Sequence, residues 1–167
     1  TGNLGDSYLG LKVLTNKAKF KNKDKLFFVD KYYKPELPLN LTKYLLKFAN
    51  SSIDVSDGLI DDLLKMINRQ SLSFHLFENK IPVSNKLSNL IKKQRLNKIN
   101  LISNGDDYQV LFTADIKKAR IIQKASKTTG IKITKIGKIV SGKDRSLIFD
   151  EKGKQIRAKS KGYIHRF

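Results

Sequence analysis

The sequence of 167 residues is long enough for one domain with a buried core, and 40% of its residues are hydrophobic, which argues against a disordered chain. It contains no cysteine, so disulfides, thiolate metal ligands and cysteine nucleophiles are excluded. Lysine and arginine outnumber aspartate and glutamate by 34 to 15, and no apolar run approaches the roughly 20 residues that a membrane-spanning helix needs.

The first 50 residues predict helices joined by loops. A helix is expected over 9–14, where Leu and Val recur, with Asp6 or Ser7 as its N-cap. The other elements predicted in this part are a flexible loop over the charged segment 17–25, a short helix at 26–35 and a helix at 39–50.

From residue 52 onward, predicted strands alternate with predicted helices. Short strands are expected at 52–55, 71–77, 108–114, 131–140 and 146–150. Helices are expected at 58–69, 85–96 and 115–130, the last beginning at Asp115 and ending at Gly130. The segment after 154 fits no element clearly. This alternation predicts a single α/β domain, or an α+β layered one.

An acidic turn, IDVSDG at 53–58, joins the strand at 52–55 to the helix after it. Ser56 or Asp57 could serve as a helix cap, but a carboxylate such as Asp54 is disfavoured at a strand end and needs another explanation. Two carboxylates that converge at a strand-to-helix turn, Asp54 and Asp57, could instead bind Mg²⁺, which prefers oxygen ligands.

The next two carboxylates have a simpler explanation. Asp61 and Asp62 fall in the first turn of the predicted helix, where negative charge is favoured by the helix dipole. Asp61 can also form an ion pair with Lys65, four residues further along the helix.

A second acidic turn, SNGDDYQVLF at 103–112, precedes a predicted strand. It could be a solvated Asn-Gly-Asp turn, or Asp106 or Asp107 could face a cationic ligand or a metal. The segment TGNLGDS at 1–7 looks like a phosphate loop but lacks the Gly-Lys-Ser/Thr ending of a P-loop. We expect a structural role for His75, and no Ser/His/Asp or zinc-ligand spacing stands out.

Four motifs occur in one order: TGNLGDSYLGL at 1–11, IDVSDGLIDDL at 53–63, NGDDYQVLF at 104–112 and GYIHRF at 162–167. Together they resemble the C-terminal half of the thiamine-monophosphate kinases, in the aminoimidazole ribonucleotide synthetase-like superfamily. The resemblance implies a C-terminal domain over 1–167, a mixed sheet packed with helices, and an N-terminal ATP-binding half that this sequence lacks. It also implies a cytoplasmic, homodimeric enzyme in which ATP and Mg²⁺ convert thiamine monophosphate to thiamine diphosphate; this chain alone would be catalytically incomplete.

The resemblance assigns roles to five residues. Asp54 and Asp57 would be Mg²⁺ ligands, Ser56 would contact ATP, and Asp106 and Tyr163 would contact the thiamine substrate. It assigns no catalytic acid or base, because the acceptor is already a phosphate anion and the metal offsets the repulsion between the two phosphates.

The sequence departs from the family pattern at four positions, which are Asn3, Asn104, Gln109 and Ile164. Gln109 replaces a glutamate near the expected substrate pocket, which leaves the fine specificity open. Other hypotheses are another ATP-dependent enzyme of the superfamily, a domain kept for assembly only, or a lysine-rich nucleic-acid-binding module. The last is disfavoured because 28 of the 34 basic residues are lysines spread along the chain, whereas base recognition favours arginine.

Overall fold

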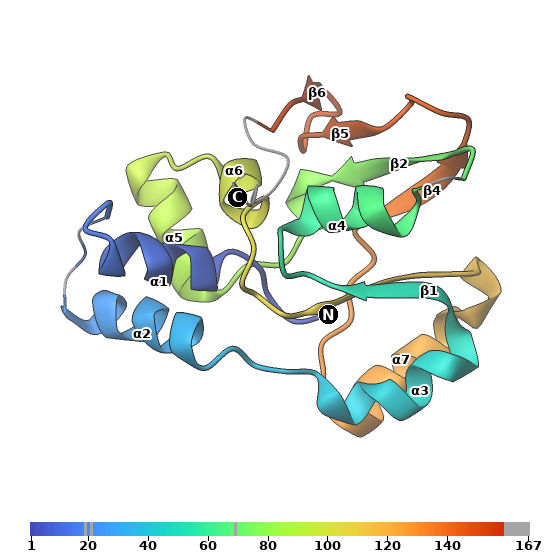
Figure 1. The fold of residues 1–167 in the computed structure, drawn as a ribbon, viewed down its shortest axis with the longest axis horizontal. Coiled ribbons are helices and arrows are strands. Elements are labelled where there is room, and N and C mark those ends of the chain that lie inside the picture. Colours follow the sequence, from blue (N-terminus) through green and yellow to red (C-terminus); the bar gives the residue numbers. More distant parts are fainter. Residues whose placement is uncertain (19, 21, 69, 159–167) are drawn as a thin grey trace, which may run out of the picture.

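The computed structural model describes residues 1–158 except 19, 21 and 69, and it has the mixed α/β architecture that the sequence predicts (Figure 1). Its larger sheet has the strand order β4-β2-β5-β6. Strand β2 (Leu72–Phe77) runs antiparallel to β4 (Gly137–Ser141) and parallel to β5 (Leu147–Phe149), which itself pairs with β6 (Gln155–Ile156). A separate antiparallel pair joins β1 (Ala49–Asp54) to β3 (Val110–Ala114).

Helix α4 (Leu59–Met66) packs against the larger sheet and supplies much of the main hydrophobic core. Its buried side chains, Leu59, Ile60 and Leu63, join Phe74 and Leu76 of β2 in one cluster. A single apolar stripe on an amphipathic helix explains why this element could be predicted from the sequence. It begins one residue later than expected and ends earlier, at Met66.

A second group of helices lies at the other side of the molecule, where α1 (Asp6–Leu14) packs along α2 (Asn22–Tyr33) (Figure 1). A β-carbon at Gly10 would lie 2.1 Å from the carbonyl oxygen of Phe28, so only glycine allows this close approach. The loop expected over 17–25 is wrong in its second half, because α2 already begins at Asn22. An acidic side chain in its first turn, Asp24, favours this early start and pairs with Lys86 at 3.0 Å.

Two further helices complete this group. Helix α5 (Asn85–Gln94) confirms the helix expected at 85–96. Helix α6 (Lys98–Ile102) was not predicted; it has only five residues and begins where the Asn97 side chain accepts a hydrogen bond from the amide of Asn100 (3.0 Å). So short a helix depends on packing by Ile99, Leu101 and Ile102, all buried, rather than on its own propensity.

Below β1 in Figure 1, α3 (Thr42–Phe48) and α7 (Ala119–Thr129) pack together. Short 3₁₀ turns, Leu39–Leu41 and Ile116–Lys118, precede them, and another, Glu78–Lys80, follows β2. Gly130 ends α7 at φ 71°, as predicted, but Asp115 caps the 3₁₀ turn rather than the helix, which begins only at Ala119. The helix expected at 39–50 ends at Phe48, and the strand expected at 131–140 begins only at Gly137.

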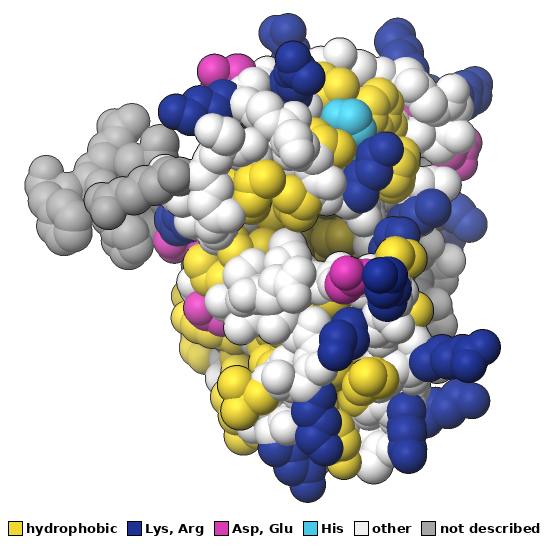
Figure 2. All heavy atoms as spheres, turned by 90° about the vertical axis from the view of Figure 1, so that its right-hand side faces the viewer, with side chains coloured by type: hydrophobic (Ala, Val, Ile, Leu, Met, Phe, Trp, Pro, Cys, Tyr) yellow, Lys and Arg dark blue, Asp and Glu magenta, His cyan; other side chains and the backbone are white. Residues whose placement is uncertain are grey.

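The surface is basic and partly hollow. In Figure 2, lysine and arginine side chains are scattered over the face rather than gathered in one patch, and a hollow lined by hydrophobic side chains opens between them. This hollow corresponds to a cavity of about 790 Å³ between the two sheets. None of the helices in the described part of the chain is long and apolar enough to cross a membrane.

Candidate metal and nucleotide site

The two acidic turns lie side by side, although about 50 residues separate them in the sequence. The pairing of β1 with β3 continues beyond both strands: the amide of Val55 donates to Gln109 O (2.8 Å) and the amide of Tyr108 donates to Val55 O (2.9 Å). Further along, the amide of Asp106 donates to the carbonyl of Ser56 (2.9 Å). Residues of both turns therefore face one region at the end of β1.

Close backbone contact between these turns depends on Gly105. A β-carbon at this position would lie 1.6 Å from the carbonyl oxygen of Ser56, a distance that no side chain can occupy. Asp106 (φ 67°) and Tyr108 (φ 51°) adopt left-handed backbone conformations that are uncommon for residues other than glycine. Hydrogen bonds from both amides to the carbonyls of Ser56 and Val55, just beyond β1, hold this backbone in place.

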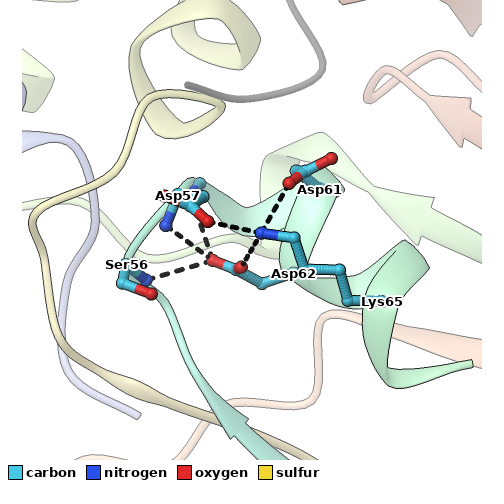
Figure 3. A network of polar contacts seen from close by, with 6 residues as sticks. Ser56, Asp57, Asp61, Asp62 and Lys65 are labelled. Atoms are coloured by element: carbon cyan, nitrogen blue, oxygen red, sulfur yellow. Dashed lines mark hydrogen bonds and ion pairs between the residues drawn. The ribbon is translucent and has the colours of Figure 1, made fainter. Parts of the chain in front are cut away.

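The carboxylate of Asp62 holds the backbone of the first acidic turn at residues 56–58. Its carboxylate oxygen Oδ2 accepts hydrogen bonds from the amides of Ser56 (3.0 Å), Asp57 (3.0 Å) and Gly58 (3.1 Å) (Figure 3). Asp62 lies in the first turn of α4, as predicted, but it is only 1% exposed, which the sequence did not indicate. The cap predicted at Ser56 or Asp57 is wrong: the N-cap position is Gly58, without a side-chain cap.

A lysine lies among the carboxylates of this turn. The Lys65 ammonium contacts Asp57, Asp61 (2.7 Å) and Asp62 (3.2 Å), so the predicted pair with Asp61 is confirmed (Figure 3). Hydrogen bonds to Asp57 and then Asp61 raise the pKa of Lys65 above its usual value. Carboxylate oxygens of the three aspartates lie within 4.8 Å of one another, which suits a cation with oxygen ligands.

Asp54 is outside that group of three but faces the same region. It is the last residue of β1 and is exposed. The pKa of the Tyr108 hydroxyl is raised first by burial and then by the charges of Asp106, Asp54 and, more weakly, Asp57. The pKa of Asp106 is raised as well, by burial and then by Asp57. Three of the sequence-predicted residues, Asp54, Asp57 and Asp106, thus all lie close enough to Tyr108 to act on its hydroxyl, and Asp57 also acts on Asp106.

The structure also separates the roles of Asp106 and Asp107, which the sequence left open. Asp107 points into the interior and accepts hydrogen bonds from the amides of Gly5 (2.7 Å) and Ser7 (3.4 Å) at the start of α1. Burial raises its pKa to about 8, although these hydrogen bonds oppose the shift. Asp107 therefore stabilises the N-terminus of α1, and Asp106 is the acid that remains near Asp57.

The segment at 1–7, which resembles a phosphate loop, therefore binds a carboxylate of the protein itself: its Gly5 and Ser7 amides donate to Asp107. Asp6 and Ser7, expected to cap α1, lie within the helix, and Gly5 at φ 88° is at the N-cap position. The Ser84 hydroxyl donates to Asp6 (2.7 Å), whose pKa burial raises to about 6. Asp6 and Asp107 line a small polar cavity of about 220 Å³.

Three other residues were singled out in the sequence: Gln109, His75 and Tyr163. Gln109 is buried; its amide donates to the carbonyl of Glu36 (2.7 Å) and accepts from the hydroxyl of Thr1 (2.8 Å), so it has a packing role. His75 packs edge-on against Phe149 at 5.5 Å, which supports a structural role. Tyr163, the other predicted substrate contact, lies outside the described residues.

No family model matches the chain, but individual proteins do. The thiamine-monophosphate kinase of Buchnera aphidicola subsp. Schizaphis graminum is 34% identical over 167 residues, which are 99% of this chain and 51% of that protein. The chain therefore spans about half the length of this relative.

Solved structures agree with this match. The structure of AaThiL complexed with AMPPCP and TMP superposes with a TM-score of 0.73 at 28% identity, covering 98% of this chain and 50% of that one. The hydrogenase maturation protein HypE of E. coli has a TM-score of 0.71 at 14% identity, with 98% of this chain and 49% of that one covered. At that identity the likeness shows a shared fold alone.

Proposed function

We propose that this chain, which is homologous to the thiamine-monophosphate kinases along 99% of its length, is one half of an enzyme that transfers the γ-phosphate of ATP to thiamine monophosphate. The observation that carries the proposal is the juxtaposition of Asp57 and Asp106 on two hydrogen-bonded turns. Thiamine diphosphate and ADP would be the products. The other half of the enzyme, to which the family resemblance assigns ATP binding, would be the N-terminal half.

The donor set at the end of β1 fits a divalent cation. Asp54 and Asp57 would hold Mg²⁺, as the family resemblance implies, because carboxylate oxygens are its preferred protein ligands. Asp57 also belongs to a group of three aspartates that already attracts the cationic side chain of Lys65. Bound Mg²⁺ would offset the negative charge of the phosphates. Burial and then the charge of Asp57 raise the pKa of Asp106, and the second of these effects indicates that a cation would be favoured here.

The residues of this chain would bind and orient both substrates. Ser56, on the turn held by Asp62, would contact ATP. Its position is fixed because its amide donates to the Asp62 carboxylate and its carbonyl accepts from the amide of Asp106. Asp106 would attract the positive charge of the thiamine ring system, and Tyr163 would pack against it. Such positioning supplies most of the catalysis in phosphoryl transfer, since the acceptor phosphate needs no base to become a nucleophile.

Other functions receive less support. A different enzyme of the superfamily would share the fold, but HypE matches the chain at only 14% identity, whereas the Buchnera thiamine-monophosphate kinase is 34% identical over 99% of the chain and the AaThiL structure is 28% identical over 98% of it. A nucleic-acid-binding module would be expected to gather its basic residues, whereas lysines and arginines are scattered in Figure 2. We further propose a homodimer in the cytoplasm, as the family resemblance implies.

The test is thiamine diphosphate formation from thiamine monophosphate and Mg-ATP, measured for the complete natural protein and for the 167-residue chain. We expect turnover in the complete protein only. In the complete protein, Asp57→Asn should lower kcat/KM by about a hundredfold or more, because a metal contact is worth several kcal/mol of transition-state stabilisation.

The matched control is Asp30→Asn, which neutralises an exposed carboxylate on α2. It should leave kcat/KM within about twofold of the wild type. Thermal unfolding of all three proteins separates lost chemistry from lost folding. Full activity in Asp57→Asn, or no thiamine diphosphate from the wild type, would refute the proposal.

A further inference from the structure

Lys65 lies among the carboxylates of Asp57, Asp61 and Asp62, where it competes with a metal ion for the Asp57 oxygen that it contacts. Its ammonium contacts Asp57, Asp61 at 2.7 Å and Asp62 at 3.2 Å (Figure 3). Mg²⁺ binds its oxygen ligands at about 2.0–2.1 Å, so an ammonium held on the same oxygen would lie only a few ångströms from the metal, and the two positive charges would repel each other.

The partners of Lys65 differ in their freedom to move. The Asp62 side chain is 2% exposed and is fixed by three backbone amides, so it cannot follow a new cation. The Lys65 side chain is 44% exposed and stands on a flexible four-carbon stem in the last turn of α4. The lysine is therefore the member of this network that can leave.

We propose that Lys65 is a resident counter-ion of the acidic turn, which a divalent cation must displace in order to bind at Asp57. This inference rests on the proposed function, which assigns Asp57 to the metal. Three carboxylates and one ammonium leave a local charge of about −2, enough to attract a divalent cation once the ammonium has moved away. Lys65 thereby lowers the affinity of the site for the metal and keeps the turn in shape before the metal binds.

The experiment measures Mn²⁺ binding to the complete natural protein, with free Mn²⁺ quantified by electron paramagnetic resonance. Four proteins are compared: wild type, Lys65→Met, Asp57→Asn and the double variant. Methionine keeps an unbranched side chain of nearly the same length and removes the ammonium group, with its charge and its hydrogen-bond donors. We expect Lys65→Met to bind Mn²⁺ about tenfold more tightly at the site that Asp57→Asn abolishes, and we expect the double variant to show no such gain.

Lys93→Met is the matched control, because Lys93 is an exposed lysine in the last turn of α5 and its loss changes the net charge equally. It should leave Mn²⁺ affinity within about twofold of the wild type. Circular dichroism checks that each variant is folded, and Lys65→Gln replaces Lys65→Met if the latter is not.

The possible failures are distinguishable. If Asp57→Asn loses a Mn²⁺ site but Lys65→Met binds Mn²⁺ as the wild type does or more weakly, the counter-ion role is refuted and the metal role of Asp57 stands. If Asp57→Asn binds Mn²⁺ as the wild type does, the metal role of Asp57 falls, and the role of Lys65 falls with it.

Discussion

Two neighbouring aspartates show how strongly the role of a residue depends on its environment. Asp61 and Asp62 have the same side chain and both lie in the first turn of α4. The side chain of Asp61 is 31% exposed and pairs with Lys65, whereas that of Asp62 is buried and holds three backbone amides of the turn at 56–58. One carboxylate therefore contributes surface charge and the other determines the shape of the turn.

This difference gives a matched pair of variants. Asp62→Ala leaves three amides without their acceptor, and we expect the free energy of unfolding to fall by about 2–4 kcal/mol. Asp61→Ala removes one exposed ion pair and should change it by less than about 0.5 kcal/mol. Urea unfolding of both variants is the measurement. Losses of similar size would show that the Asp62 hydrogen bonds do not stabilise the turn.

At the scale of elements, local patterns were sufficient for some of the fold and not for the rest. The amphipathic helix α4 and the glycine that ends α7 are visible in the sequence, and so is the alternation of β2. The existence of α6 depends on the burial of its apolar side chains, and the late start of β4 follows from its pairing with β2, which ends at Gly137. The early start of α2 is favoured by Asp24, whose ion pair with the distant Lys86 the sequence does not reveal. Residue types pointed to Asp54, Asp57 and Asp106, but only the pairing of β1 with β3 and of the turns beyond them brings these residues together.

The contact between the two turns can be tested at Gly105. Gly105→Ala would place a methyl group against the carbonyl of Ser56, which belongs to the backbone and cannot rotate away. We expect a loss of about 3 kcal/mol or more in the free energy of unfolding. Gly130→Ala is the control: nothing lies within 4 Å of the β-carbon that this substitution would add, so only its φ of 71° should cost about 1 kcal/mol. Equal losses, measured by urea unfolding, would mean that the turns lie further apart in solution.

At the scale of the whole molecule, the strongly basic composition conceals an acidic interior. The formal net charge is +19, yet the buried charged residues in the described part of the chain are Asp6, Asp62 and Asp107. Most lysines are on the outside, where long side chains remain solvated. Function and pH response are therefore expected to follow these few carboxylates rather than the net charge.

The two buried acids near α1 predict how stability depends on pH. Burial raises the pKa from 3.8 to about 6 for Asp6 and about 8 for Asp107, so the folded chain binds these protons more tightly than the unfolded chain does. Their contribution to stability is complete below about pH 4 and is lost as the pH rises through 6 and then 8.

Asp6→Asn removes one of these titrations and can still accept the hydrogen bond from Ser84. We expect this variant to gain about 2–3 kcal/mol relative to the wild type between pH 4 and pH 7 in urea unfolding. Asp24→Asn, at an exposed ion pair with Lys86, should show no such gain, and parallel curves for wild type and Asp6→Asn would rule out a raised pKa at Asp6.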